Sequence, residues 1–562
     1  MKLSSGNVFN LKRGEIRVFY GEITLDHDDT IRAWISCPGK AECLSVEGHD
    51  FLGAWFDKLD KKATAGVPKK LWFYVKAPNE AGKYNGTITV TTTARKVLAN
   101  LAITLNVSEE IFEGDAFENE GDLSRLFWLN SELGINSEVP KPFMPVCFDG
   151  NRVMVLGRDV ELDEYGLPKR ITSHFDKEGN ISDESYEILS EKVKFTVGEE
   201  SFKIISSGAL CHDDYFSFSS VSESDSFMMK TRATIEFDGF CSYKITLIAK
   251  RDAKLSNVNL CLPISECSRK YFAGLGSVGG AFSGELDFKW DKAKNQDSFF
   301  IGCDNAGIRV KFKDEKYKKP ATNGFFSLKP LNMPKSWDNL GRGGIVYEND
   351  CFNAYSGECE FSYGEKRSFD FELLITPTKP KASAKTPQIE IPYGHVLNPL
   401  LNYPLANEEA LSSFIKSAHE KGERVGISYT LGELDKSAPE FSAFSAFDSE
   451  LLLKASGDSL AICDGESRLC NFYVETLKRL VEKCQIDGIT LNGAEFDRNT
   501  AKRIRRVLDE REGTTLTLNI ENQFTEESGF ASAIVEFAEL FPYVDKITIR
   551  DEGTIPTSVF GI

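Results

Sequence analysis

The stretch YVETLKRLVEKCQIDGITL, residues 473–491, decides the fold of the last third of the chain. Its apolar residues recur at the spacing of one helical face: Tyr473, Leu477, Leu480, Val481 and Cys484. The next residues, Gly488 to Leu491, have the composition of a short strand. A helix followed this closely by a strand predicts one unit of a parallel α/β layer.

The same alternation of helix and strand continues on both sides of this stretch. Asn407 is placed to cap a helix that runs to about Lys421, and a strand at 424–430 follows it. Two later units end in strands at 516–520 and 546–549. Four strands are too few for a complete barrel, which has eight strands in about 250 residues. We therefore predict a truncated TIM-barrel-like α/β domain over residues 391–562.

The rest of the chain has β patterning. Residues 1–112 alternate polar and apolar residues between turns, which predicts a small Ig-like β-sandwich. Residues 123–377 continue the pattern in longer runs and predict one large β-sandwich. Residues 378–390 are rich in proline, lysine and small residues, which indicates a linker. The predicted fold is multidomain, mainly β and then α/β.

Composition excludes several classes of function. The 562 residues carry a formal charge of -18, which argues against nucleic-acid binding. No stretch is apolar enough to predict a signal peptide or a membrane crossing, so we expect a cytoplasmic protein. The 13 cysteines are scattered without a CxxC pair and are expected to be reduced, mostly buried thiols. No motif indicates a metal or a cofactor.

Several phrases of the sequence resemble one bacterial family. They are Ser124 to Ser131, Leu156 to Arg158, Gly302 to Gly307, Ser336 to Asn339, Phe371 to Pro380, Asn398-Pro399, Asn402 to Pro404, Tyr429-Thr430 with Glu433-Leu434, Asn522 to Phe524, and Phe541 to Tyr543. The family is glycoside-hydrolase-like and distantly related to glycoside hydrolase family 123. The resemblance implies two β-sandwich modules ahead of a (β/α)8 barrel.

The resemblance breaks where the chemistry is expected. Glycosidases need two carboxyl groups, or one acid with a group that orients a substrate acetamide, at the ends of the barrel strands. Directly after the strand at 488–491 the family has an adjacent pair of aspartates, whereas this chain has Asn492 and Gly493. The family arginine two residues after Thr430 is Gly432 here. We interpret the chain as a pseudoenzyme with no catalytic residues.

A few carboxylates persist near the degenerate site as residual candidates. They are Glu495, Asp497, Glu521 and Asp551. Asp497 and Arg498 are expected to cap or pair locally at the start of a helix that runs to about Leu508. Asp551 is expected to be a solvated strand end.

Three other signals have structural interpretations. His27 and His212 each precede two aspartates, but adjacent side chains on a strand face opposite ways, so we expect exposed loops. The run 274–279 matches GxGxxG without a helix behind it and is assigned to turns. The basic run 311–319 is expected to be a solvated hairpin, with contact to an acidic protein surface as the alternative.

The leading functional hypothesis is a non-catalytic, intracellular structural or interaction component of a larger protein assembly, for which cytoskeletal or other filamentous structures are candidates. One alternative is a carbohydrate-binding pseudoenzyme that lost only turnover. Another is an active glycoside hydrolase with a relocated carboxylate pair.

Overall fold

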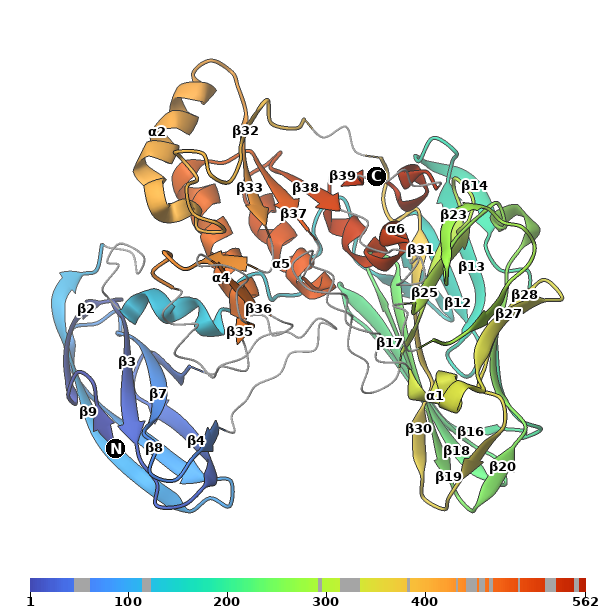
Figure 1. Cartoon of the computed structure of the whole chain (residues 1–562), viewed down its shortest axis with the longest axis horizontal. Helices are drawn as coiled ribbons and strands as arrows, with labels where there is room; N and C mark the ends of the chain where they lie inside the picture. Colours follow the sequence, from blue (N-terminus) through green and yellow to red (C-terminus); the bar gives the residue numbers. More distant parts are fainter. Residues whose placement is uncertain are drawn as a thin grey trace. The chain divides into compact units, whose positions relative to one another are not determined.

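The computed structural model describes residues 1–44, 61–113, 123–291, 296–313, 334–381, 385–430, 433–440, 452–453, 460–463, 468–493, 496–520, 532–549 and 555–562 (Figure 1). The chain forms two compact units, each assembled from separate segments. The first contains residues 1–134, 393–412 and 432–484, and the second contains residues 135–392, 413–431 and 485–562. The C-terminal α/β segment therefore contributes to both units.

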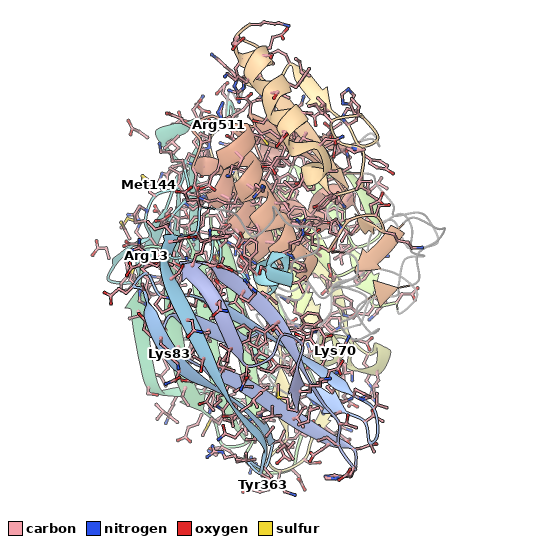
Figure 2. The ribbon with its side chains drawn as sticks, turned by 90° about the vertical axis from the view of Figure 1, so that its left-hand side faces the viewer. Arg13, Lys70, Lys83, Met144, Tyr363 and Arg511 are labelled. Atoms are coloured by element: carbon pink, nitrogen blue, oxygen red, sulfur yellow. A yellow bond between two sulfur atoms is a disulfide. The ribbon has the colours of Figure 1, made fainter. Side chains whose placement is uncertain are left out.

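The first unit contains a small β-sandwich. One sheet has the order β1 (Lys2–Leu3), β3 (Ile16–Ile23), β7 (Lys69–Lys76), β5 (Lys40–Cys43). The other has the order β2 (Val8–Arg13), β9 (Val97–Ile111), β8 (Gly82–Thr92), β4 (Asp29–Ser36), β6 (Lys61–Ala63). Alternate side chains of both sheets, including Phe19 and Leu105, form one buried core. Lys70 and Lys83 project from the outer surface (Figure 2).

The first unit also contains short helices and a small antiparallel sheet. They are η1 (Leu123–Asn130), η4 (Pro404–Asn407), α4 (Arg468–Arg479), η5 (Leu480–Cys484), β34 (Glu433–Asp435), β35 (Leu452–Leu453) and β36 (Leu460–Cys463). The predicted apolar face of residues 473–484 is buried. Arg125 of η1 forms a buried ion pair with Glu440 at 2.7 Å and donates to the Tyr403 hydroxyl at 2.5 Å.

The second unit holds a large β region with four sheets. The largest has the order β16 (Lys203–Cys211), β17 (Tyr215–Glu223), β18 (Phe227–Glu236), β19 (Phe240–Ala249), β31 (Asp370–Thr376), β26 (Gly307–Lys313), β25 (Ser298–Gly302), β22 (Tyr271–Gly274), β23 (Ser277–Ala281), and β30 (Lys366–Ser368) pairs with β19. A second sheet contains β10 (Cys147–Asp149), β11 (Arg152–Val155), β12 (Arg158–Leu162), β13 (Pro168–Phe175) and β14 (Ile181–Glu187). A third sheet contains β15 (Lys194–Val197), β21 (Val258–Pro263), β28 (Cys351–Tyr355), β27 (Gly344–Glu348) and β24 (Asp287–Lys289). The fourth sheet consists of two strands, β20 (Ala253–Leu255) and β29 (Cys359–Phe361).

The expectation that all cysteines are reduced, mostly buried thiols is wrong at Cys261 and Cys351, which form a disulfide between β21 and β28. Three of the remaining cysteines, Cys147, Cys211 and Cys267, are exposed. Disulfides persist mainly in oxidising compartments. The pairing joins residues 90 positions apart, and nothing in the spacing of the cysteines indicated it.

The second unit also contains the parallel sheet of the C-terminal segment. Its order is β32 (Ile389–Ile391), β33 (Val425–Thr430), β37 (Gly488–Asn492), β38 (Thr515–Ile520), β39 (Lys546–Ile549), and all four pairings are parallel. The four predicted strands are confirmed. Helix α2 (Glu408–His419) precedes β33 and begins after Asn407, which donates to the carbonyl of Val396. Helices α5 (Arg498–Asp509) and α6 (Ala533–Glu536) follow later strands.

The segment expected as a linker is structured at both ends. Thr378 and Lys379 are buried, and the Lys379 ammonium donates to the carbonyls of Pro542 and Val544 at 3.1 and 2.5 Å. Burial lowers the pKa of Lys379 to about 8. Strand β32 begins at Ile389, inside the expected linker, and supplies a fifth parallel strand.

The predicted class, mainly β followed by α/β, is confirmed. Over the described ranges the parallel sheet has five strands, whereas a complete barrel has eight. None of the helices in these ranges has the length and apolar character that a membrane crossing requires.

Candidate functional site

The parallel sheet has one apolar face and one polar face. Its register aligns alternating rows of side chains across neighbouring strands. The polar rows are Glu390, Gly426, Gly488 and Thr515; then Ser428, Thr490, Thr517 and Lys546; then Asn492, Asn519 and Thr548. Parallel sheets are usually covered on both faces and apolar throughout. The alternation here leaves a polar face, which would face the inside of a complete barrel.

The polar face is partly open, whereas the apolar rows are covered. Ser428, Thr490 and Thr517 are half-buried and Glu390 is exposed. In contrast, Ile427, Ile489 and Leu518 are buried, and α5 packs against β38. The strands therefore present hydroxyl and amide groups to a space that solvent reaches. We define Glu390, Ser428, Thr490, Asn492, Thr517 and Asn519 as the polar face.

Asn492 and Gly493, where the resemblance predicts a degenerate catalytic site, lie at the C-terminal end of β37, next to β38. The Asn519 side-chain amide donates to the Asn492 side-chain oxygen at 2.8 Å, and the Gly493 amide donates to the Asn519 carbonyl at 2.9 Å. Neither amide side chain can exchange a proton near neutral pH. Gly493 has a φ of 99°, a conformation that side chains with a Cβ rarely adopt. An aspartate at position 493 would therefore be strained in this backbone.

Pro387 lies across the N-terminal end of the polar face. A Cβ on Gly488 would approach the Pro387 ring to 2.6 Å, and one on Gly426 would approach it to 3.0 Å. Next to it, the Glu390 carboxylate accepts from the Ser428 hydroxyl at 2.7 Å. The residue as a whole is exposed, but desolvation of its carboxyl group raises the pKa of Glu390, and the Ser428 and Thr490 hydroxyls oppose this shift. Glu390 lies at the end of the sheet opposite Asn492.

Asp487 is a structural anchor at the N-terminal end of β37. Its carboxylate contacts His419 at 2.7 Å and Arg511 at 2.8 Å and accepts from the Val425 amide at 2.8 Å. These contacts tie α2, β33 and the segment after α5 to the start of β37. Groups at this end of barrel strands stabilise the fold, whereas catalysis uses the other end.

Asp497 and Arg498 are anchored in the structure. Asp497 is buried, and its side chain accepts from the Thr500 amide at 2.6 Å, which confirms the predicted cap of α5. Arg498 pairs with distant residues, contrary to the expected local partner: Glu236 at 2.8 Å and Asp238 at 2.6 Å. Asp497 therefore has a structural role as the cap of α5.

The pairing at Arg498 is electrostatically strong. Burial by itself would raise the pKa of Glu236, but the charges of Arg498 and Lys502 outweigh it and lower the pKa to about 2. Tyr543 donates to Asp238 at 2.7 Å, and burial raises the pKa of Tyr543 well above its usual value. This cluster, made by Glu236, Asp238, Arg498, Lys502 and Tyr543, joins α5 to the large β region.

The other residual candidates, Glu495, Glu521 and Asp551, lie outside the described residues, as does Gly432. Whether they form a relocated carboxylate pair stays a prediction. The polar face was not predicted from the sequence. The period-2 alternation of Thr490 with Ile489 and Leu491, repeated at Thr517 and Thr548, was the signal that could have shown it.

The remaining sequence signals have structural explanations. His27 lies in a bend and His212 in an exposed connection, both next to strands. Residues 275–276 form the turn between β22 and β23, whereas Gly274 and residues 277–279 lie in the strands themselves, so the assignment of the whole run to turns is wrong there. The prediction of a solvated hairpin is wrong at Lys311, which is buried in β26 with its ammonium 3.6 Å from Asp297. Residues 314–319 lie outside the described ranges. Among the described residues, no three His, Cys, Asp or Glu side chains are arranged to hold a metal ion.

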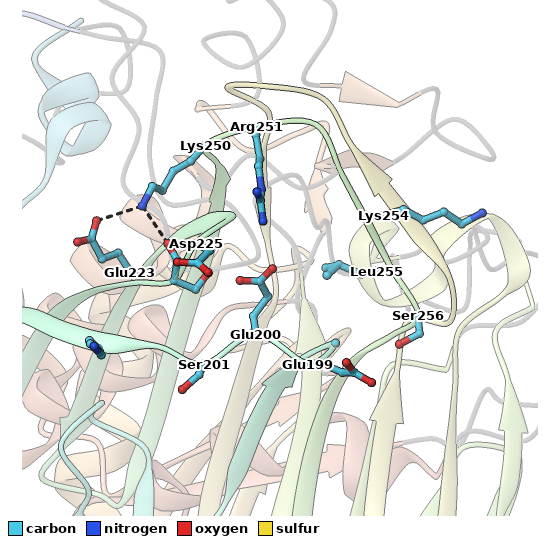
Figure 3. A pocket seen from close by; sticks show the side chains of 13 residues that line it. Glu199, Glu200, Ser201, Glu223, Asp225, Lys250, Arg251, Lys254, Leu255 and Ser256 are labelled. Atoms are coloured by element: carbon cyan, nitrogen blue, oxygen red, sulfur yellow. Dashed lines mark hydrogen bonds and ion pairs between the residues drawn. The ribbon is translucent and has the colours of Figure 1, made fainter.

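A hollow of about 800 Å³ lies at one end of the large β region (Figure 3). Its acidic and basic side chains face one another: the Lys250 ammonium contacts Glu223 at 3.3 Å and donates to the Ser224 carbonyl at 2.9 Å. Burial would raise the pKa of Glu200, but hydrogen bonds from Ser224 and Ser226 and the charge of Arg251 lower it. A carboxylate that stays ionised is a poor general acid, so Glu200 is not suited to that role.

Comparison with known proteins assigns the architecture to glycoside hydrolases. Residues 146–377 match the family described as glycoside hydrolase 123, third domain, and residues 375–463 and 453–553 match the glycoside hydrolase 123 TIM-barrel domain. The two matches together run from residue 146 to residue 553, which is more than half of the chain. The chain belongs to a distant glycoside-hydrolase-like family related to family 123.

Solved structures are similar only at low identity. A family 123 glycoside hydrolase from Clostridium perfringens shares 14% identity over 19% of this chain and 23% of that chain, with a TM-score of 0.15. The cycloalternan-forming enzyme from Listeria monocytogenes shares 8% identity over 95% and 56%, with a TM-score of 0.25. A β-arabinopyranosidase shares 9% identity over 67% and 66%, with a TM-score of 0.21. The chain spans a quarter to about half the length of the first two. No curated protein matches the chain.

Proposed function

We propose that this chain is a non-hydrolysing member of its family that acts by binding, as a structural or interaction component of a larger protein assembly. The Asn492–Asn519 amide pair supports the loss of hydrolysis, because it occupies the strand ends where the family has its acidic pair. Cleavage of a glycosidic bond needs a proton donor and a charge-stabilising group together, and two amides provide neither. The backbone at Gly493 also disfavours a replacement carboxylate there.

A panel of aryl glycosides that includes N-acetylhexosaminides tests the loss of hydrolysis. The wild-type chain and the Glu495→Gln variant are expected to release aryl alcohol at the same rate as buffer. A rate that exceeds buffer in the wild type and falls in the variant would instead establish a glycoside hydrolase with a relocated carboxylate.

Carbohydrate binding without turnover is the second candidate, and the polar face favours it. Sugar hydroxyls donate and accept hydrogen bonds, and Ser428, Thr490 and Thr517 present matching groups that solvent reaches. Calorimetric titration with oligosaccharides should give a heat of binding that the Thr490→Val/Thr517→Val double variant loses. The matched control is Thr87→Val/Thr89→Val, which changes half-buried strand threonines in the first sandwich. Equal heats in both double variants would remove the polar face as the binding site.

The cytoplasmic location expected from the sequence stays part of this proposal, and the Cys261–Cys351 disulfide counts against it. Alkylation of the chain inside intact cells, followed by mass spectrometry, should find both thiols modified in a reducing compartment. Unmodified, linked peptides would place the chain in an oxidising one.

A further inference from the structure

A cavity of about 300 Å³ lies between two sheets of the large β region, and it shares Glu200 and Ser201 with the hollow of Figure 3. Its walls come from β15, from β18 and β19, and from the turn at 163–167. Small-molecule sites have volumes of about 300–1,000 Å³ and mostly apolar walls with a few polar groups. Here the apolar side chains are Leu167, Val193, Phe195, Phe202, Met229 and Ile245.

The Thr231 hydroxyl is a buried polar group in the wall of this cavity. Thr231 is 3% exposed and lies on β18 between Ser220 of β17 and Ile245 of β19. The Ser220 hydroxyl donates to the Tyr165 carbonyl at 3.0 Å, whereas no described residue forms a hydrogen bond with the Thr231 hydroxyl. Buried polar groups in native proteins bond to protein, water or ligand. This hydroxyl therefore indicates that something occupies the cavity.

Asp163 provides a second polar group, which its own turn holds in place. Its Oδ1 accepts from the Tyr165 and Leu167 amides at 2.9 Å each, while no described group donates to its Oδ2. Desolvation raises the pKa of Asp163, and the two amides and the charge of Lys192 oppose this shift. The Tyr165 hydroxyl donates to the Phe202 carbonyl at 2.9 Å, which fixes this wall of the cavity. The site is therefore formed before a ligand binds.

The charges around the cavity favour a cationic ligand over an anionic one. The carboxylates of Asp163 and Glu200 are half-buried, whereas Lys192 and Lys194 are exposed. The charge of Arg251 already offsets Glu200. Asp163 is therefore the carboxylate that remains to pair with a ligand, and an anionic ligand would be repelled by it.

We infer that this cavity binds a small primary amine whose apolar body carries a second hydrogen-bonding group. The ammonium donates to Oδ2 of Asp163, and the second group bonds to the Thr231 hydroxyl. A ring suits the body, because edge and offset contacts with Phe195 and Phe202 stabilise aromatic pairs. A saccharide fits poorly, because most of its hydroxyls would be buried against apolar side chains.

This ligand site goes beyond the proposed function and does not depend on it. The cavity lies within residues 163–245 of the large β region, whereas the degenerate site lies on the parallel sheet. Binding of an amine leaves the loss of hydrolysis untouched, and hydrolysis would leave the amine site untouched.

Three ligands with the same ring test the required charge. Tyramine carries an ammonium and a phenol hydroxyl, phenethylamine lacks the hydroxyl, and phloretate has a carboxylate in place of the ammonium. Calorimetric titration of the full chain should give tyramine a dissociation constant below about 1 mM, with phenethylamine about fivefold weaker and no binding of phloretate. No heat with either amine up to about 10 mM would mean that water alone fills the cavity, and it would overturn the inference. Phloretate that binds as tightly as tyramine would also overturn it.

Two isosteric variants separate the two polar contacts. Asp163→Asn keeps an acceptor for the Tyr165 and Leu167 amides but removes the charge, so both amines should bind about tenfold more weakly or worse. Thr231→Val should weaken tyramine about fivefold and leave phenethylamine unchanged. Since no described residue bonds to that hydroxyl, Thr231→Val should not lower the melting temperature.

The matched control is Thr234→Val, because Thr234 is a half-buried threonine on the opposite face of β18. It should leave the dissociation constants of both amines unchanged. Equal affinity of tyramine for the wild type and Asp163→Asn would overturn the inference. So would a Thr231→Val variant that melts earlier and loses both amines equally, because the hydroxyl would then have a structural role only.

Discussion

Replacing Arg498 by methionine removes the charge that holds α5 against the large β region. Its guanidinium makes three contacts, with the two oxygens of Glu236 at 2.8 and 3.0 Å and with Asp238 at 2.6 Å, and its side chain is 8% exposed. Removing one partner of a buried ion pair costs about 3–5 kcal/mol, because the other charge stays buried. Methionine keeps apolar contact with the Phe240 ring, which lies 4.2 Å from the guanidinium carbon.

The pKa of Glu236 gives a second measure of the free energy that this ion pairing contributes to the fold. Its folded pKa of about 2 lies well below the ordinary value of 4.5, and this difference corresponds to about 3 kcal/mol. Lys502 provides part of this and remains in the variant. We therefore expect Arg498→Met to cost about 3 kcal/mol. Because the pKa of Glu236 is lowered in the folded state, its ionised carboxylate stabilises the fold above pH 4.5. This contribution is lost as the pH falls towards 2, so the destabilisation caused by Arg498→Met should become smaller in acid.

Hydrogen exchange measured on peptides of α5 reports the free energy of local opening of that helix. It therefore applies to a chain with two units, for which a single free energy of unfolding is not well defined. At pH 7, Arg498→Met should reduce protection of α5 about 100-fold. The control Arg170→Met breaks a surface pair whose side chains are 57% and 35% exposed, and it should change stability by less than about 1 kcal/mol. Equal protection in both variants would refute the assignment of a strong buried pair at Arg498.

Three further predictions concern other sites. Asp497→Ala removes the cap of α5 and should lower stability by about 1 kcal/mol in urea unfolding, whereas Asp497→Ser should lose less; no loss would contradict the capping role. Burial raises the pKa of Asp370 to about 6, so stability should rise as the pH falls from about 6 to 4. Asp370→Asn should gain about 2 kcal/mol at pH 7 and lose that pH dependence, and an unchanged profile would contradict it. Reduction of the Cys261–Cys351 disulfide should cost about 4 kcal/mol, because the bond closes a loop of 90 residues; thermal melting with and without reductant, compared with Cys261→Ser, measures it.

Local patterns in the sequence predicted the elements that depend on local physics. The helical face from Tyr473 to Cys484 and the four strands were readable because their apolar periodicity is short-ranged. The cap at Asp497 followed from its place before Arg498 and a helical run. Strand β32 was missed because three residues flanked by Pro387 and Pro392 resemble a linker.

Contacts between distant residues could not be predicted. Arg498 and Glu236 are separated by 262 residues, and a single sequence gives no sign of their pairing. Lys311 was assigned to a solvated hairpin because its neighbours are charged, yet β26 buries it beside Asp297. The polar face depends on the register of four strand pairings, which fixes Thr490 beside Ser428 and Thr517.

Bond cleavage measured with isotopic sensitivity tests the loss of hydrolysis most directly. The chain, at a concentration comparable to that of an N-acetylhexosaminide substrate, is incubated in ¹⁸O-labelled water, and the label in the released sugar is followed by mass spectrometry. With Asn492 and Asn519 at the strand ends, the rate of label incorporation should equal that of buffer between pH 4 and pH 8. A protein-dependent rate that Glu495→Gln abolishes would contradict the account.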